Sequence, residues 1–257
     1  WGGDVQLTDD IDHGQIAGDQ DGALTSFEVG PDLNGDGEAE LWIGQANLND
    51  EGEDPIYFGR SSFLSGFPAA DAAVSELAFA DMRVSDLERG HGVAAIFGDY
   101  DGDGLVDALI SATLEAYGGA DNAGAVYLYS DIGPSLTDQG LDAVALADAD
   151  IQGQYADGYL GSRLLQMGDM NGDGVDDFVV REPGGGSGAT GRLRLVSGAA
   201  VSGSALNVDD IELMEWRGED SQAGTGLVVA TGDIDADGIG DLVITAPYWG
   251  AATTGSN

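Results

Sequence analysis

One nine-residue pattern rich in acids recurs four times along this chain, and short apolar runs flank every copy. The copies read DLNGDGEAE at 32–40, DYDGDGLVD at 99–107, DMNGDGVDD at 169–177 and DIDADGIGD at 233–241. Their first aspartates are 64 to 70 residues apart. Self-similarity at a near-constant period indicates a repeat architecture, in which each copy belongs to one supersecondary unit.

The apolar runs around each loop predict β-strands. TSFEVG, VAAIFG, LLQMG and LVVATG come before the loops, and LWIG, ALIS, FVV and LVIT come after them. These runs are short and rich in β-branched or aromatic residues, which favours strands over helices. We therefore expect each acidic loop to be the turn of a tight hairpin.

Further strands complete each unit. Residues 124–130 and 191–197 are predicted third strands, and residues 143–151 and 210–216 are predicted fourth strands. Segment 69–82 has helix propensity, but its place in the repeat favours a loop and an outer strand. Four antiparallel strands per unit predict an all-β propeller built of four-stranded blades. The repeats are expected at about 19–82, 83–151, 152–216 and 217–257.

The two ends of the chain are in different phases of the repeat. Residues 9–18, DDIDHGQIAG, align without a gap to residues 209–218, DDIELMEWRG, so the chain begins in the outer part of a blade. It ends just after the second strand of a blade. Residues 1–18 are therefore predicted to complete a blade, either by closing a ring of four or within a segment of a longer propeller. The phase of the repeat leaves both arrangements open.

The loop pattern fits a hard cation. Counted from the first aspartate, positions 1, 3 and 5 carry Asp or Asn, position 6 is Gly and position 9 is Asp or Glu. Oxygen ligands at alternate positions converge on one ion, and position 7 can add its backbone carbonyl. Calcium accepts six or more oxygens and is the first choice, ahead of magnesium, which retains more water. About four calcium sites are expected.

Position 12 excludes the helical EF-hand loop. That loop needs a bidentate Glu there, followed by a helix, whereas this chain places apolar strand residues at Ile43, Ile110, Val180 and Ile244. Cellulosome-type dockerins, which share the first half of the pattern, are disfavoured for the same reason. A solvated Asn-Gly-Asp-Gly turn would explain a single copy, but four copies between strands favour metal binding.

The pattern resembles the FG-GAP repeat of integrin alpha-subunit β-propellers and of bacterial extracellular proteins. That unit runs Phe-Gly, apolar strand, calcium loop, second strand, Gly-Ala-Pro. The copies TGLVVATGDIDADGIGDLVITAP (225–247) and LGSRLLQMGDMNGDGVDDFVVREP (160–183) match it best, whereas the first two copies end in GQA (44–46) and ISA (110–112). The Phe of Phe-Gly is replaced at Leu160, Thr225 and His91. The family usually has seven blades, and this chain has repeats for four.

The resemblance implies a calcium ligand set in each loop. In loop one the implied ligands are Asp32, Asn34, Asp36, Glu40 and the carbonyl of Glu38. In loop two they are Asp99, Asp101, Asp103, Asp107 and the carbonyl of Leu105. In loop three they are Asp169, Asn171, Asp173, Asp177 and the carbonyl of Val175. In loop four they are Asp233, Asp235, Asp237, Asp241 and the carbonyl of Ile239. Glu40 is one methylene longer than Asp, so loop one is expected to be the weakest or most distorted site.

The charge of the chain excludes several functions. It has 47 acidic and 8 basic residues, all Arg, for a net charge of −39, which repels phosphate backbones and anionic membranes. No stretch approaches the roughly 18 apolar residues of a membrane span. There is no Cys, and neither His13 nor His91 lies in a recognisable nucleophile motif, so a structural role is favoured for both histidines. We expect no enzymatic activity.

Aromatic residues in Gly-rich loops are candidates for ligand binding. The resemblance implies that ligands meet the face opposite the calcium loops, where we place Tyr117, Tyr155, Tyr159, Tyr248 and Trp249, together with Arg89 and Arg217. Such aromatics can stack on sugars or anchor a partner protein. The alternative is that they pack between blades.

The sequence thus favours a non-enzymatic, calcium-binding extracellular propeller module for adhesion, protein interaction or assembly. Its expected location is secreted or at the cell surface, and its expected partner is an extracellular protein or glycan, or a second copy of itself. Two alternatives stay open. One is a propeller that binds or acts on polysaccharide, and the other is a structural subunit of an extracellular polymer.

Overall fold

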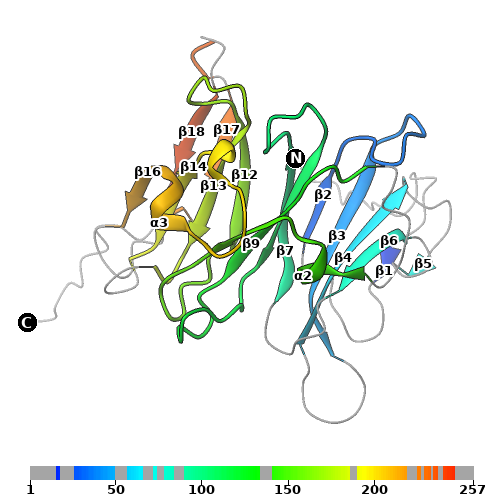
Figure 1. Ribbon diagram of the computed structural model, residues 1–257, viewed down its shortest axis with the longest axis horizontal. Helices are drawn as coiled ribbons and strands as arrows, with labels where there is room; N and C mark the ends of the chain where they lie inside the picture. The colour runs from blue at the N-terminus through cyan, green and yellow to red at the C-terminus, as the bar shows by residue number, and fades with distance from the viewer. Residues whose placement is uncertain are drawn as a thin grey trace, which may run out of the picture.

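The chain folds almost entirely into β-strands that form a row of separate sheets (Figure 1). The computed structural model describes residues 16–17, 26–49, 57–65, 72–73, 78–83, 90–133, 141–185, 190–218, 225–226, 229–232, 234–236 and 240–246. The sheets stand side by side and face one another across apolar layers, as the blades of a propeller do. The prediction of an all-β, propeller-like fold with antiparallel blades is confirmed.

Three four-stranded blades and the first half of another follow one another along the chain. Blade one contains β2 (Ser26–Val29), β3 (Glu40–Asn49), β4 (Tyr57–Ser65) and β6 (Ala78–Arg83). Blade two contains β7 (His91–Gly98), β8 (Asp107–Ala112), β9 (Ala125–Tyr129) and β11 (Ala149–Gln152). Blade three contains β12 (Arg163–Gly168), β13 (Asp177–Glu182), β14 (Arg192–Val196) and β16 (Glu212–Arg217). Blade four is described as the pair β17 (Val229–Gly232) and β18 (Asp241–Ile244). Within every blade, neighbouring strands are antiparallel.

Two-residue strands tie each blade to the one before it. β10 (Leu141–Asp142) pairs in parallel with the outer strand β6, and β15 (Leu206–Asn207) pairs in parallel with the outer strand β11. The corresponding strand of blade one, β5 (Ala72–Ala73), pairs in parallel with β1 (Ile16–Ala17). By the same rule, β1 occupies the place of an outer strand in a blade that precedes blade one.

That residues 1–18 complete a blade stays a prediction. Residues 1–15 and 18, the rest of the segment expected to complete a blade, lie outside the described residues. Among the residues that are described, β1 pairs with neither β17 nor β18, and Figure 1 shows them at opposite sides of the molecule. Within the described part of the chain, a closed ring is not found.

The predicted fourth strands begin too early. Residues 143–146, expected as strand, form the one-turn helix α2 (Ala143–Leu146), and the strand starts only at Ala149. Likewise α3 (Val208–Ile211) covers the start of the predicted strand 210–216, and β16 follows it. The cause is local capping, because the carboxylate of Asp142 accepts the Val144 amide and the side chain of Asn207 accepts the Asp209 amide, both at 3.0 Å. In segment 69–82 the expected outer strand is confirmed as β6.

Apolar side chains fill the spaces between neighbouring blades. Trp42 and Phe63 of blade one meet Phe97 of blade two, and the Phe63 and Phe97 rings lie edge to face with centroids 6.5 Å apart. The next layer joins blades two and three, and a smaller one joins blades three and four. Strands β8 and β9 are buried along their whole length because both faces of their sheet are covered. None of the described helices has the length and apolar character needed to cross a membrane.

Candidate metal centres

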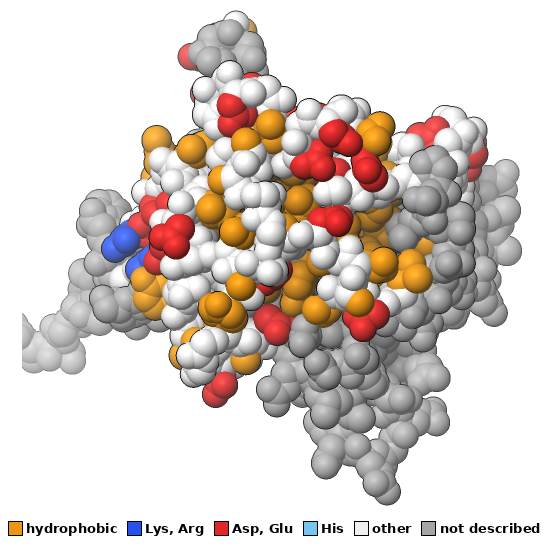
Figure 2. Space-filling view, viewed as in Figure 1, with side chains coloured by type: hydrophobic (Ala, Val, Ile, Leu, Met, Phe, Trp, Pro, Cys, Tyr) orange, Lys and Arg blue, Asp and Glu red, His pale blue; other side chains and the backbone are white. Residues whose placement is uncertain are grey.

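The four acidic loops lie along one edge of the molecule, each joining the first two strands of its blade (Figure 1). Acidic side chains gather along this edge on the face shown in Figure 2. The loops occupy 32–39, 99–106, 169–176 and the described parts of 233–240. The prediction that each is the turn of a hairpin is confirmed by the pairing of the strands on both sides.

The first aspartate of each fully described loop folds the backbone around its own carboxylate. One oxygen accepts the amide at position 4 and the other accepts the amide at position 6. These bonds join Asp32 to Gly35 at 2.7 Å and Gly37 at 2.8 Å, Asp99 to Gly102 at 2.7 Å and Gly104 at 2.9 Å, and Asp169 to Gly172 at 2.6 Å and Gly174 at 2.8 Å. All six glycines have positive φ, between 80° and 92°, which explains the residue type at both positions. In loop four, position 4 is Ala236, with φ of 63°.

Positions 3 and 5 continue this pattern. Side-chain oxygens of Asn34, Asp101 and Asn171 accept the amide at position 5, at 2.8, 3.2 and 2.8 Å. The carboxylates at position 5 accept the amide at position 7, whose residues are Glu38, Leu105 and Val175. Each loop therefore turns its oxygens inward and its amides toward them.

The acid at position 9 closes every loop in the same way. One carboxylate oxygen accepts the amide of position 2, so the end of the loop is tied to its start. The pairs are Glu40 with Leu33, Asp107 with Tyr100 at 2.7 Å, Asp177 with Met170 at 2.9 Å, and Asp241 with Ile234 at 2.7 Å. Glu40 reaches the same amide as its shorter counterparts.

The second carboxylate oxygen of the position 9 acid has a different hydrogen-bond partner in each loop, or none. In Asp107 it accepts the Asp131 amide at 3.0 Å, and in Asp177 it accepts the Gly198 amide at 3.2 Å. Glu40 is buried, and its Oε1 has no hydrogen-bond partner. A buried carboxylate oxygen without a partner is costly, so its position in the acidic loop indicates a place for a cation.

Burial makes these acids hard to ionise in the absence of a cation. It raises the pKa of Asp107 to about 6, with the nearby carboxylates of Asp101 and Asp99 adding to the effect. Burial likewise raises the pKa of Glu40 and of Asp177. A bound cation would reverse this trend, because it stabilises the charged form of the carboxylate.

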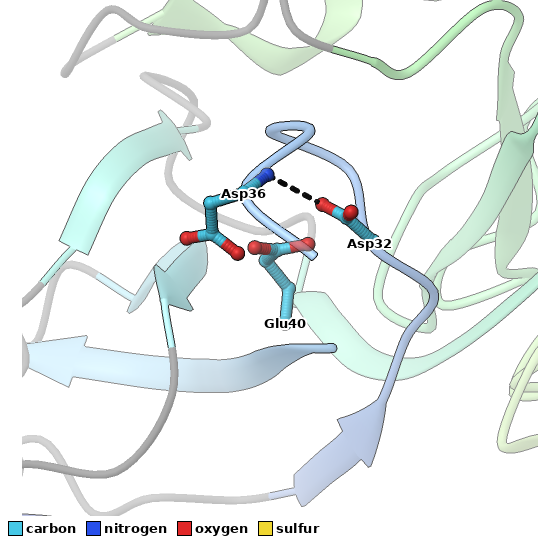
Figure 3. A group of neighbouring side chains, drawn as sticks. All are labelled: Asp32, Asp36 and Glu40. Atoms are coloured by element: carbon cyan, nitrogen blue, oxygen red, sulfur yellow. Dashed lines mark hydrogen bonds between the residues drawn. The ribbon is translucent and has the colours of Figure 1, made fainter. Parts of the chain in front are cut away.

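Two of the loops bring three acids together closely. One oxygen each from Asp32, Asp36 and Glu40 lies within 4.8 Å of the others, and so do oxygens of Asp99, Asp101 and Asp107. Figure 3 shows the first group, with the carboxylates of Asp36 and Glu40 side by side and Asp32 accepting the Asp36 amide. All donors are oxygen, which fits calcium and gives nothing to a metal that prefers nitrogen or sulfur.

Loop three holds its expected residues in the same hydrogen-bond pattern, although no three of its acids meet as closely. In loop four, Asp235 and Asp241 are described, and both take part in the closing contact with position 2 or its neighbour. Asp233, Asp237 and Ile239 lie outside the described residues. The carbonyl ligands at position 7, and the weakness of loop one, stay predictions.

Serines at the end of the third strand also contact the loops, and sequence reasoning missed them. Ser65 donates its hydroxyl to Asp36 at 2.6 Å and accepts from Asn34 at 3.1 Å. Ser197 lies 3.5 Å from Asp173 and accepts from Asn171 at 3.3 Å. The hydroxyl of Ser65 is the first cause of the lowered pKa of Asp36. A repeated signal was present, because SSFLS, VYLYS and LRLVS all end in Ser.

Three of the five candidate ligand-binding aromatics lie within the described residues. Tyr155 is half-buried, and its ring lies 4.3 Å from the Arg192 guanidinium. Tyr159 is half-buried, and its amide donates to the Asn122 carbonyl at 2.9 Å. Tyr117 is exposed in the turn at 117–120. Arg217 is exposed and paired with Glu215, while Arg89, Tyr248 and Trp249 lie outside the described residues.

His91 has the structural role favoured by the sequence. It is buried between blades one and two, with Nδ1 at 3.3 Å from the Ser61 hydroxyl and Nε2 at 3.0 Å from the Tyr129 hydroxyl. Burial lowers its pKa to about 3. His13 lies outside the described residues.

Comparison with known proteins supports the reading of the repeats. The FG-GAP repeat matches residues 164–196 and 225–257. Mouse integrin alpha-IIb is 29% identical over an alignment of 198 residues, which covers 72% of this chain and 18% of that protein. Drosophila melanogaster integrin alpha-PS5 is 28% identical over an alignment of 163 residues, which covers 61% of this chain and 15% of that protein. The chain thus spans less than a fifth of either relative.

Among solved structures, the rhamnogalacturonan lyase YesW aligns with 86% of this chain and 40% of its own, at 13% identity and a TM-score of 0.46. A similarity at that level supports no conclusion about activity. Two segments of the chain thus match the FG-GAP repeat, and the chain is similar to integrin alpha subunits.

Proposed function

We propose that the chain is a non-enzymatic, calcium-binding extracellular propeller module that serves adhesion, protein interaction or assembly. The observation that carries the proposal is the common construction of the four loops. In each, the acid at position 9 is tied to the amide of position 2. In two of them, it converges with two further carboxylates.

The donor set favours calcium. Carboxylate and amide oxygens supply the ligands, and the unpartnered Oε1 of Glu40 gives loop one a free buried oxygen. Calcium accepts six to eight oxygens in flexible geometry. Asp32, Asp36 and Glu40 would hold the ion in loop one, and Asp99, Asp101 and Asp107 would hold it in loop two. The remaining two loops would use their residues at the same positions.

A bound cation would supply charge compensation. The carboxylates of one loop would repel one another when ionised, and burial makes Asp107 and Glu40 costly to ionise alone. An ion that binds the folded loop and not the unfolded chain stabilises folding by mass action. Because the loop joins the two inner strands of a blade, this stabilisation acts where blades pack together.

The similarity to integrin alpha subunits supports a role in interaction with an extracellular protein. A glycan, or a second copy of the chain, is the other partner that the repeat architecture would suit. The burial of His91 supports the absence of general acid–base chemistry at that residue, because a buried imidazole with a pKa of about 3 cannot reach a substrate or ionise near neutral pH.

Calcium titration calorimetry on a set of single variants tests the proposal. Asp32→Ala, Asp99→Ala and Asp169→Ala each remove a position 1 carboxylate, and each should lower the number of bound ions by one. Asp210→Ala is the matched control, since it removes one exposed acid from helix α3, away from the loops. Equal loss of binding in the control and the loop variants, or no saturable binding in the parent chain, would refute the calcium assignment.

A further inference from the structure

Two arginines of blade three face each other at the end of the blade that is remote from its acidic loop. Arg163 is the first residue of β12, and Arg181 lies directly opposite it in β13. Directly opposed residues project from the same face of a sheet, where like charges destabilise the pair. The placement is therefore unfavourable for the sheet itself.

No carboxylate neutralises this pair within the described residues. Arg163 is exposed and has no hydrogen-bond or ion-pair partner there, although the chain has 47 acids and only 8 basic residues. Arg181 donates from Nε to the Thr225 carbonyl at 3.1 Å and from Nη1 to the Ser162 hydroxyl at 3.4 Å. By contrast, an acidic side chain pairs with each of Arg60, Arg192, Arg194 and Arg217.

The other repeats show that a blade does not need these arginines. Counted from the first aspartate of each loop, the place of Arg163 is taken by Ser26, Val93 and Leu227. The place of Arg181 is taken by Gly44, Ser111 and Thr245. Both positions are basic in blade three alone, so the positive pair is a property of this site and not of the repeat.

Arg163 also lines a cleft of about 720 Å³ between the first strands of the blades. Its walls include apolar side chains from three of them, among which are Val29 of β2, Phe97 of β7 and Leu165 of β12. Val29 is largely exposed. The cleft therefore offers one cation that has no ion-pair partner among the described residues, beside apolar surface and the carboxylate of Glu28.

We propose that this cleft binds an acidic side chain of a partner protein, carried on a short segment with apolar neighbours. The guanidinium of Arg163 would take the carboxylate, because its fork of donors matches a carboxylate in geometry and charge. Arg181, held against the Thr225 carbonyl, adds positive charge beside it. The apolar walls would take the neighbouring side chains. This inference rests on the proposed role in protein interaction and names the partner's chemistry.

A single carboxylate fits the site better than a polyanion does. Glu28 of β2 lines the same cleft, so a second acidic group on the ligand would meet a like charge. The net charge of −39 also repels an extended acidic polymer at a distance. A peptide with one acid among apolar residues avoids both penalties.

Binding of a capped Gly-Leu-Asp-Phe-Gly peptide to the calcium-saturated chain tests the proposal. The arginine Nε–Hε resonances report the site directly, and we expect the signal of Arg163 to shift on titration. Arg163→Gln should weaken binding about tenfold or more, and Arg163→Lys should restore part of it. Arg217→Gln, which removes an exposed charge from the same blade, is the matched control and should bind as the parent does.

The Asn analogue of the peptide should bind at least about tenfold more weakly, because it lacks the charge. Equal binding of the two peptides, or equal loss in Arg163→Gln and Arg217→Gln, would overturn the proposal. Binding of an oligogalacturonate in place of the peptide would assign the cleft to acidic glycans and would also overturn it. If calcium titrates the loops normally while the peptide fails to bind, this inference fails and the calcium-binding module stands.

Discussion

The ring of Tyr100 packs edge to face against the ring of Phe178, with centroids 5.6 Å apart and planes at 79°. Tyr100 is the second residue of acidic loop two, and its amide donates to Asp107 at 2.7 Å. Phe178 lies in the next blade, directly after the closing acid of loop three. One side chain therefore joins an acidic loop to the apolar layer between blades two and three. The candidate metal sites and the packing of the blades should be coupled.

Replacement of Tyr100 tests this coupling. Tyr100→Ala removes a fully buried ring, so we expect the free energy of unfolding to fall by about 3–5 kcal/mol. The calcium affinity of loop two should fall with it. Tyr100→Phe is the control, because it keeps the ring and removes a buried hydroxyl that has no partner; its stability should equal or exceed that of the parent. Denaturant unfolding in calcium measures both, and a large loss in Tyr100→Phe would contradict this account of the ring.

Ala236 occupies a backbone conformation that suits glycine. Its φ is 63°, and the equivalent residues of the other three loops are Gly35, Gly102 and Gly172. Ala236→Gly should raise the free energy of unfolding by about 1 kcal/mol, because the left-handed conformation costs a side chain that amount. Gly35→Ala is the reverse experiment. Its added Cβ would meet no atom within 4 Å, so the substitution changes only the energy of the backbone conformation. Thermal unfolding should move in opposite directions for the two variants.

His91 should make stability depend on pH. Its pKa is about 3 when folded and 6.5 when unfolded, because burial disfavours the charged ring. Between these values the unfolded chain binds the extra proton, so stability should fall as pH falls. From pH 6.5 to 5 the loss should be about 2 kcal/mol. Denaturant unfolding in calcium measures the free energy of unfolding at both pH values. Between them, His91→Gln should lose less stability than the parent by that amount. Equal losses in the two proteins would show that the folded ring is not held neutral.

Arg194 is the centre of a buried charge cluster in blade three. It is fully buried and contacts Glu182 at 2.7 Å, Asp209 at 2.7 Å and Glu212 at 2.9 Å. Arg194→Met leaves the buried Glu182 without its cation, and we expect a loss of about 3–5 kcal/mol in the free energy of unfolding. The double variant Arg194→Met with Glu182→Leu should recover part of this loss. If the loss in the double variant equals the sum of the losses in Arg194→Met and Glu182→Leu, the direct pairing is contradicted.

Much of the blade could be read from local sequence. The loops, the two strands around each of them and the third strands of blades two and three follow from alternation of acidic turns with apolar runs. The one-turn helices α2 and α3 could not be read in this way. Residues 143–146 are apolar and fit a strand, and only the capping bonds of Asp142 turn them into a helix. The two-residue strands that join blades are too short to have a periodicity.

The sequence predicts the acids of the candidate sites but not the serines that contact them. Acids and asparagines at positions 1, 3, 5 and 9 recur at fixed spacing, and three acids converge at positions 1, 5 and 9 of loop one and at positions 1, 3 and 9 of loop two. The hydroxyls that support them come from distant segments, since Ser65 lies 29 residues after Asp36 and Ser197 lies 24 residues after Asp173. Only the pairing of the third strand with the second brings them to the loop. The opposed arginines likewise emerge from strand register, because 163 and 181 are not neighbours in sequence.

Thermal unfolding in calcium and in excess chelator, compared between the parent chain and a variant with Ala at Asp32, Asp99, Asp169 and Asp233, tests the central claim most directly. A site filled at about one hundred times its Kd stabilises the fold by about 2.7 kcal/mol, so several sites together should shift the melting temperature strongly. Chelation should lower the melting temperature of the parent and leave that of the variant unchanged. A parent chain that melts at the same temperature with and without calcium would contradict this claim.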